Sequence, residues 1–363
     1  MTCTQSAVQS LPFVSGVSAP STDEKVRFLS TRASYAERSA CIEVKQTHMS
    51  WLFLTDMTVY KLKKPVVYPF LDFRSLQARA ADCRDELILN RRLAPSVYQG
   101  LSCLLLRPDR RLALVDASDM PDKRAGEVVE WLVRMRRLPD ELTLERAIRA
   151  RQLTAADLAS VGIVLAAFYL PLAPSAVTED EHVALLKSQH ALNVEMLGRP
   201  RFALDPALLT RVLPALQRWI ENESTLLRVR VRQGRVIEGH GDLRPEHVFL
   251  TDPPVVIDCL EFNRPLRLVD WADEIAFLGL ECARLGAHGV GPSLRAQLER
   301  ALGDPVPDRL FDFYGAFRAC MRARLALAHL IEPEPPTSDK WPRLAREYLE
   351  LAAAAAGRMQ AAQ

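Results

Sequence analysis

The chain lacks any long apolar run, and this absence argues against membrane-spanning helices. No stretch approaches the roughly 18 consecutive apolar residues that such a helix needs. The longest run, residues 162–173, is interrupted by Pro171. The N-terminus also lacks a basic segment followed by an apolar core, which is the pattern of a signal peptide. We therefore expect a cytoplasmic protein without a membrane partner.

Paired cysteines and an excess of charge are absent as well. The seven cysteines are scattered singly and form no CxxC pair, which argues against a zinc site and against a disulfide framework. The 47 Lys and Arg residues nearly balance the 45 Asp and Glu residues, so the net charge of +2 gives no reason to expect a nucleic-acid partner. The P-loop motifs GxxxxGKS and GxxxxGKT are missing too, which excludes a P-loop kinase mechanism in this chain.

The composition that remains is that of a globular protein, with 48% hydrophobic and 25% charged residues. Residues 1–25 are rich in Ser, Thr and Pro without periodicity, and we predict a disordered tail. Residues 26–137 are predicted to form a small, β-rich N-lobe with one main helix. Residues 138–363 are predicted to form a larger, mostly helical C-lobe, so the fold class is α+β and bilobal.

Residue periodicity places the elements of the two lobes. Residues 41–68 alternate around the polar break TDMT, which is typical of a hairpin, and apolar residues at helical spacing indicate a helix at 73–95. Further strands are expected at 100–108, 111–116 and 127–139. Helices of the C-lobe are expected at 154–170, 178–197, 205–232, 266–285, 306–331 and 338–360.

One β insertion interrupts the helical part and carries the residues best suited to catalysis. Asp242 precedes the strand of HGDLRPEHVFL, and Asp258 ends the strand of VVIDCLEFN. Because a hairpin folds back on itself, both carboxylates are expected at the same edge, with His247 within reach. Two acids and a third ligand can divide the work of phosphoryl transfer, one handling the proton of the nucleophile and the other holding a metal ion. The alternative is that both aspartates are turn formers.

The segment HGDLRPEH…VVIDCLEFN resembles the catalytic segment of aminoglycoside phosphotransferase-like kinases, a branch of the protein-kinase-like fold. Their pattern is His-Gly-Asp, four residues, Asn, and then an apolar strand that ends in Asp. The segments around QTHMSWLFLTDMTVYKLKKPVVYPFLDF, DELILNRRLAP and VVEWLVRMRRLP are similar to a bacterial subfamily of that superfamily, so the resemblance covers about residues 26–330. It implies a small-molecule phosphotransferase that moves the γ-phosphate of ATP or GTP to a hydroxyl acceptor with Mg²⁺.

The resemblance also implies a role for each matching residue. Asp242 takes the place of the catalytic base, and Asp258 that of the acid that holds Mg²⁺ against the phosphates. Lys61 matches the lysine that contacts the α- and β-phosphates, and Lys63 is the fallback because it lies on the same strand face. Glu86 matches the helix glutamate that pairs with that lysine. Without the resemblance, the lysines would be interpreted as a solvated strand edge and Glu86 as an exposed helix charge.

A further aspartate, Asp270, resembles the family aspartate that begins a helix beneath the catalytic loop, where we expect a capping role.

Two features depart from the family pattern. His247 stands where the second metal ligand, asparagine, is usual, and imidazole favours Mn²⁺ or Zn²⁺ over Mg²⁺. The site then works with one well-held metal, or His247 contacts phosphate or acceptor, or transfer is impaired. The hairpin THMSWLFLTDMTVYK also contains no glycine, which weakens any expectation of a tight grip on nucleotide phosphates.

Three functional hypotheses follow from these residues. The first is the metal-dependent phosphotransferase, and the second is a catalytically impaired kinase-like protein that binds nucleotide or metabolite without transfer. A metallohydrolase on the same carboxylates is weaker, because it gives no role to Lys61 and Glu86. The acceptor is as readily a sugar or an amino alcohol as another metabolite, and the sequence specifies neither ATP over GTP nor an oligomeric state.

Overall fold

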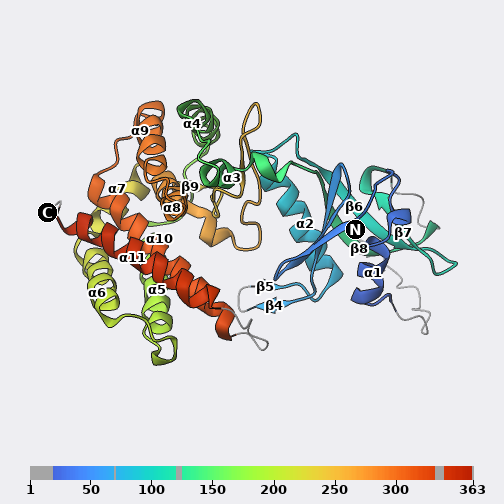
Figure 1. The fold of residues 1–363 in the computed structure, drawn as a ribbon, viewed down its shortest axis with the longest axis horizontal. Helices are drawn as coiled ribbons and strands as arrows, with labels where there is room; N and C mark the ends of the chain where they lie inside the picture. Colours follow the sequence, from blue (N-terminus) through green and yellow to red (C-terminus); the bar gives the residue numbers. More distant parts are fainter. Residues whose placement is uncertain (1–18, 69–70, 120–124, 332–338, 362–363) are drawn as a thin grey trace, which may run out of the picture. The chain divides into compact units, whose positions relative to one another are not determined.

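The computed structural model describes residues 19–68, 71–119, 125–331 and 339–361, and Figure 1 shows their helices and strands. Its contacts divide the chain into two compact units. The first unit contains residues 19–67, 72–83 and 100–135, and the second contains 84–99 and 136–361 together with the short segment at 68–71. The boundary predicted at residues 137 and 138 remains a prediction for the lobes, since the contacts group residues 84–99 with the second unit.

The first unit is built on a sheet that, within the described residues, has six strands in the order β1-β2-β3-β8-β6-β7. The predicted hairpin is present, since β2 and β3 pair antiparallel around the polar break. Tyr60 and Leu62 of β3 belong to the apolar core on one face of the sheet, beside Phe53 and Leu132. The strands of this sheet are β1 (Glu43–Gln46), β2 (Ser50–Leu54), β3 (Thr58–Lys63), β6 (Tyr98–Leu106), β7 (Leu112–Asp116) and β8 (Glu127–Arg136). A small pair is formed by β4 (Val67–Tyr68) and β5 (Leu71–Asp72).

The helix α1 (Thr22–Leu29) corrects the predicted tail at its C-terminal end. Residues 1–18 of the predicted tail lie outside the described residues, but Thr22 to Lys25 are helical because Ser21 and Glu24 form a capping box. Lys25 is buried and its Nζ lies 2.9 Å from Glu130 of β8. The tail composition therefore concealed a helix that a buried ion pair attaches to the sheet.

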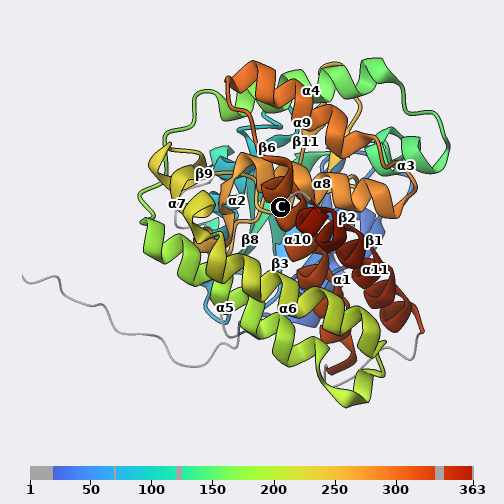
Figure 2. The ribbon, with the colours of Figure 1, turned by 90° about the vertical axis from the view of Figure 1, so that its left-hand side faces the viewer.

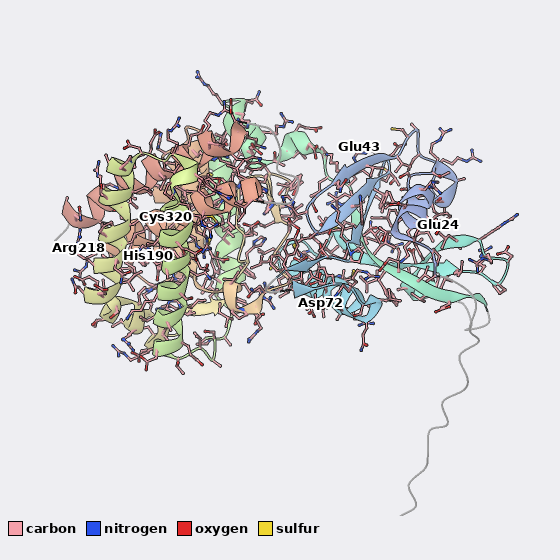
Figure 3. All side chains as sticks on the ribbon, turned by 90° about the horizontal axis from the view of Figure 1, so that it is seen from below. Glu24, Glu43, Asp72, His190, Arg218 and Cys320 are labelled. Atoms are coloured by element: carbon pink, nitrogen blue, oxygen red, sulfur yellow. The ribbon has the colours of Figure 1, made fainter. Side chains whose placement is uncertain are left out.

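The second unit consists mainly of helices packed around α8 (Trp271–Arg284), in which every residue from Trp271 to Cys282 is buried. Figure 2 shows α5 and α6 beside the long helices α10 and α11, and α11 packs against both α6 and α10. The fully buried side chains of these helices include His190 of α5 and Cys320 of α10 (Figure 3). The other helices are α2 (Leu76–Asn90), α3 (Leu144–Arg149), α4 (Ala155–Tyr169), α5 (Glu179–Leu197), α6 (Pro206–Asn222), α7 (Ser224–Arg232), α9 (Val290–Leu302), α10 (Asp308–Ala328) and α11 (Lys340–Ala361).

The predicted helices of the second unit are present, with local differences. The pattern at 205–232 contains two helices, α6 and α7, and the pattern at 266–285 begins with a strand before α8. The helices α3 and α9 were not predicted. Two short antiparallel pairs lie among the helices, β9 (Val236–Glu238) with β12 (Leu268–Asp270) and β10 (Val248–Phe249) with β11 (Val255–Val256).

Two absences expected from the sequence can be compared with the described residues. No helix among them is long and apolar enough to cross a bilayer. The described cysteines form no disulfide.

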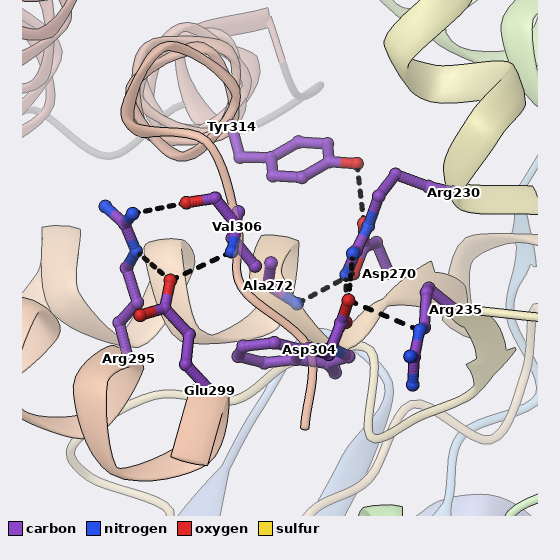
Figure 4. Close-up of polar contacts among 10 residues, drawn as sticks. Arg230, Arg235, Asp270, Ala272, Arg295, Glu299, Asp304, Val306 and Tyr314 are labelled. Atoms are coloured by element: carbon purple, nitrogen blue, oxygen red, sulfur yellow. Dashed lines mark hydrogen bonds and ion pairs between the residues drawn. The ribbon is translucent and has the colours of Figure 1, made fainter. Parts of the chain in front are cut away.

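A buried ion network fixes the start of α8 against α7 (Figure 4). The Arg230 guanidinium donates to both carboxylate oxygens of Asp270, at 2.6 and 2.9 Å, and to both of Asp304, at 2.7 Å each. Asp270 also accepts from the backbone N–H of Ala272, which is the expected capping role, and from the hydroxyl of Tyr314. The Arg230 guanidinium is thus the cation that the two buried carboxylates share, and Asp304 also has Arg235, whose Nε lies 3.3 Å from one of its oxygens.

Replacement of Arg230 by Met is expected to lower the free energy of unfolding by about 3–5 kcal/mol, because it leaves Asp270 and Asp304 buried without that cation. The matched control is Arg228→Met on the same helix, whose partner Asp180 is 86% exposed, and there the loss should stay below about 1 kcal/mol. Urea unfolding of both variants measures the difference. Equal stability of the two variants would contradict this account of the network.

Candidate active site

The hairpin of β10 and β11 and the loop before it bring three of the predicted site residues together. In this hairpin Val248 pairs with Val256 and Phe249 with Val255. The Nδ1 atom of His247 lies 3.7 Å from a carboxylate oxygen of Asp242, and its Nε2 atom lies 3.5 Å from one of Asp258. The imidazole thus lies between the two carboxylates.

The hydrogen bonds of His247 determine which of its nitrogens carries the proton. Its Nδ1 lies 2.9 Å from the carbonyl oxygen of Asp242, which can only accept, so Nδ1 must donate. In the neutral imidazole Nε2 then carries a lone pair, and it is directed toward the side of Asp258. A lone pair and a carboxylate oxygen 3.5 Å apart repel each other unless a proton or a cation lies between them.

His240 is a buried structural residue at the start of the loop. Its Nε2 donates to the carbonyl of Ile257 at 3.0 Å, and its Nδ1 accepts from the N–H of Asp242 at 3.3 Å. Burial and, to a smaller extent, the nearby His247 together lower its pKa from 6.5 to about 4, although Asp242 acts in the opposite direction. The ring is therefore neutral at pH 7 and joins the loop to the end of β11.

Contacts with α8 fix the backbone of the loop that carries Asp242. Gly241 has φ +84°, and a Cβ there would lie 2.9 Å from the Cβ atoms of both Leu260 and Arg267, so only glycine fits. Its N–H donates to Glu274 of α8, which also accepts from the Tyr169 hydroxyl at 2.9 Å. Burial raises the pKa of Glu274, although these hydrogen bonds lower it in part.

Comparisons with known proteins show what this chain is similar to. No family model matches the chain. It is 30% identical over 297 residues to an uncharacterized protein of Mycobacterium tuberculosis and to one of Mycobacterium bovis, and the match covers 81% of this chain but 56% of each relative. The chain thus spans about half the length of these curated relatives.

Among solved structures, the chain is similar to a choline/ethanolamine kinase family protein from Mesorhizobium loti. The TM-score is 0.53 at 14% identity, over 94% of this chain and 98% of that one. An aminoglycoside phosphotransferase from Alicyclobacillus acidocaldarius matches with a TM-score of 0.46 at 13% identity, over 91% and 94% of the two chains. The chain thus has the fold of this choline/ethanolamine kinase family protein. This confirms the predicted α+β fold class.

In this fold, residues at and after the end of α2 hold both ends of the candidate site. Arg92 donates to the carbonyls of Glu238 and Gly239, each at 2.7 Å. The side-chain oxygen of Asn90 accepts from the N–H of Cys259 at 2.8 Å. These contacts were not predicted, although the segment DELILNRRLAP that carries both residues was recognised as part of the family resemblance.

The Tyr98 hydroxyl accepts from the N–H of Asp258 at 3.2 Å. Asp258 itself has φ +61°, a left-handed conformation that Asp tolerates better than most residues. Tyr98 therefore helps to hold the candidate metal-binding acid in an uncommon backbone conformation, and its role was likewise not predicted.

The two lysines and Glu86 are more buried than residues of a solvated strand edge or an exposed helix face would be. The strand β3 is an inner strand of its sheet, so Lys61 and Lys63 do not lie on a solvated edge. Lys63 is 2% exposed and its Nζ lies 2.8 Å from Asp82 of α2, a partner that was not predicted. Glu86 is fully buried rather than an exposed helix charge.

The donor set of Asp258 and His247 fits a divalent cation. A carboxylate oxygen of Asp258 and the Nε2 atom of His247 lie 3.5 Å apart, and Mn²⁺ and Mg²⁺ both accept such ligands, with imidazole shifting the preference toward Mn²⁺. Both residues could therefore hold the predicted metal, while Asp242 has a different neighbour, Arg244, whose Nη1 lies 3.6 Å from the carboxylate.

The buried His240 should make stability depend on pH. The unfolded chain takes up a proton near pH 6.5, whereas the folded protein resists it until about pH 4, so the contribution of His240 is complete above pH 6.5 and is lost as pH falls through about 4. The advantage of the wild type over His240→Asn in unfolding free energy should shrink by about 3 kcal/mol across this range.

Urea unfolding between pH 7 and pH 4 tests this expectation, with His288→Asn, at an exposed position of the second unit, as the control. The control should keep a constant difference from the wild type. A pH-independent difference for His240→Asn would show that its protonation is not linked to unfolding.

Proposed function

We propose that this chain is a small-molecule phosphotransferase that moves the γ-phosphate of ATP or GTP to a hydroxyl group of a small acceptor. One observation carries the proposal: a hairpin and its preceding loop set His247 between the carboxylates of Asp242 and Asp258, on a backbone fixed to the core. The fold is that of small-molecule phosphotransferases. Because the curated relatives are about twice as long as the matched part, the proposal concerns this chain alone.

Asp242 is proposed as the catalytic base. Its side chain is 28% exposed, so an acceptor can reach it, while the His240 ring and the Gly241 turn fix the backbone from which it extends. An acceptor hydroxyl that donates to this carboxylate is oriented for attack and loses its proton to it as the bond to phosphorus forms. The neighbouring Arg244 guanidinium, which is also paired with Glu246, places hydrogen-bond donors beside the developing negative charge.

Asp258 and His247 are proposed to hold the divalent cation. The cation would shield the negative charge of the nucleotide phosphates, which otherwise repels the nucleophile. The Nδ1–H bond from His247 to the Asp242 carbonyl turns Nε2 toward Asp258, so the chain itself selects the tautomer that can bind a metal.

Lys61, Lys63 and Glu86 are proposed to contribute to nucleotide phosphate binding. Of the two lysines we favour Lys63, because Asp82 holds its ammonium group in a buried position. A lysine fixed by a carboxylate loses less entropy when it binds phosphate than a half-exposed one.

A second candidate, a nucleotide-binding protein without transfer, is favoured by one observation. His247 stands at the position usual for asparagine, and the hydrogen bond of Nδ1 leaves a single nitrogen for a metal. Binding of ATP with Mn²⁺ that raises the melting temperature, without phosphorylated product from any acceptor, would support this candidate over the transferase.

Asp242→Asn is expected to lower acceptor phosphorylation by about 10²–10⁴-fold, because the amide cannot take the hydroxyl proton. The matched control is Asp252→Asn, at an exposed turn of the same hairpin, which should leave the rate unchanged. Product formation from labelled ATP, measured over a metabolite library, provides the readout. Unchanged turnover in Asp242→Asn would sink the proposed mechanism.

Lys63→Met is expected to weaken nucleotide binding by tenfold or more, whereas Lys61→Met should have a smaller effect. The physical reason is that Met leaves the carboxylate of Asp82 buried without its cation and removes the fixed ammonium group. Calorimetric titration with ATP compares the two variants, and Asp82→Asn should behave like Lys63→Met. The reverse order of the two lysines would assign phosphate binding to Lys61.

A further inference from the structure

A cluster of charged side chains lies where α8 packs against α10 and α11. The Oη atom of Tyr348 lies 2.8 and 2.9 Å from the two carboxylate oxygens of Glu281. The Nε atom of Arg322 lies 2.8 Å from one of these oxygens, and that of Arg284 lies 3.3 Å from the other. We call these four residues the Glu281 cluster.

The cluster contains more positive than negative charge. Two guanidiniums share the single carboxylate of Glu281. Burial raises the pKa of Tyr348 to about 12, so its phenol adds no negative charge at pH 7. Glu347 lies 3.9 Å from Arg284 and its side chain is 42% exposed, which makes it a weak, solvent-screened partner. About one positive charge is therefore left without a close partner.

A ligand of this cluster would contact its arginines rather than its carboxylate. The Glu281 side chain is fully buried, whereas those of Arg322 and Arg284 are 17% and 21% exposed. The rings of Phe277 and Tyr348 lie under the Arg322 guanidinium, with ring centroids 5.9 and 5.6 Å away, and hold it in place. A partly exposed and fixed guanidinium is suited to bind a carboxylate or a phosphate.

The cluster lies on the same helices that support the catalytic loop. Glu274 of α8 binds Gly241, next to Asp242, and Glu281 follows two turns, or about 10 Å, along the same helix. On α10, Arg318 binds Asp273 and Arg322 binds Glu281 one turn further on. Burial lowers the pKa of Arg322, but its neighbours, Glu281 foremost and Asp242 among them, outweigh this effect and raise the pKa overall.

The carboxylates of α8 are not available to a cationic acceptor. Asp273 is buried and accepts two hydrogen bonds from Arg318, at 2.8 and 2.6 Å. Glu281 is inaccessible, and Glu274 is committed to Gly241 and Tyr169. An ammonium group that reached Arg322 and Arg284 would meet two partly exposed guanidiniums, and the solvent-screened Glu347 would offset little of the repulsion.

We propose that the acceptor carries an anionic group, a carboxylate or a phosphate, that binds Arg322 and Arg284 while its hydroxyl reaches Asp242. This inference deepens the proposed phosphotransferase function and rests on it. It sets the acceptor apart from amino alcohols and amino sugars, which carry the opposite charge.

The test uses the wild-type chain with ATP, Mg²⁺ or Mn²⁺ and acceptors matched in size. Gluconate is compared with glucosamine, 3-hydroxypropanoate with 3-aminopropan-1-ol, and glycerol 3-phosphate with glycerol. We expect kcat/KM to be at least about tenfold higher for the acidic member of a pair. The first two pairs test carboxylates and the third tests a phosphate, so the panel distinguishes the two sources of anionic charge.

Arg322→Gln should lower the ratio of kcat/KM between the acidic and the matched non-acidic acceptor by at least about tenfold. Arg324→Gln is the matched control on the same helix, because Arg324 binds Gln189 of α5 instead. This ratio compares two acceptors on one enzyme, so a general loss of activity does not move it. If Arg322→Gln fails to fold, the wild-type panel and calorimetric binding of the same acceptors decide the question.

The outcomes separate the inference from the proposed function. Phosphorylation of the amino alcohols with inert acids overturns the inference and keeps the phosphotransferase. Preferential binding of the acids without transfer to any acceptor supports the inference and contradicts the phosphotransferase. No preference for acids in either transfer or binding overturns the inference.

Discussion

The hydrogen bond between the Gly241 backbone and the buried carboxyl of Glu274 is the contact on which the arrangement of the site depends. It attaches the loop that carries Asp242 to α8, whose residues from Trp271 to Cys282 are all buried in the second unit. Burying an acid there is costly, and its raised pKa reflects that cost. The N–H of Gly241 and the hydroxyl of Tyr169 offset part of it, so the loop, α8 and α4 stabilise one another.

The same helix organises most of the buried charge of the second unit. Each of its acids, and the Asp270 cap before it, has an arginine or hydrogen-bond donor from another helix as its partner: Arg230 of α7, Tyr169 of α4, Arg318 and Arg322 of α10, and Tyr348 of α11. Such networks specify how helices align more than they add to stability, because desolvation cancels much of the attraction. One of them is rich in arginine and partly exposed, which gives the proposed acceptor region its positive charge.

The segment of the candidate site shows how much the local sequence predicts. The alternation in VFL and VVI together with the short TDPP turn predicted a hairpin, and a hairpin brings Asp242, His247 and Asp258 together whatever surrounds it. The lysine pair shows the limit. Strand alternation places Lys61 and Lys63 on one face, but it cannot say that Asp82 lies opposite Lys63. That pairing depends on how α2 packs on the sheet, which brings together residues about twenty positions apart.

By itself, the sequence determined the α+β class, the main helices and strands, and the local meeting of His247 with two aspartates, because these follow from periodicity and short-range chain geometry. It did not reveal the helix α1, because the composition of residues 1–25 is typical of a disordered tail. Only the tertiary structure decided that Arg92, Asn90 and Tyr98 hold the backbone of the candidate site, that Glu274 fixes the Gly241 turn, and that Arg322 and Arg284 share Glu281. These contacts join residues far apart in the chain, and side-chain packing, which no local pattern encodes, selects their partners.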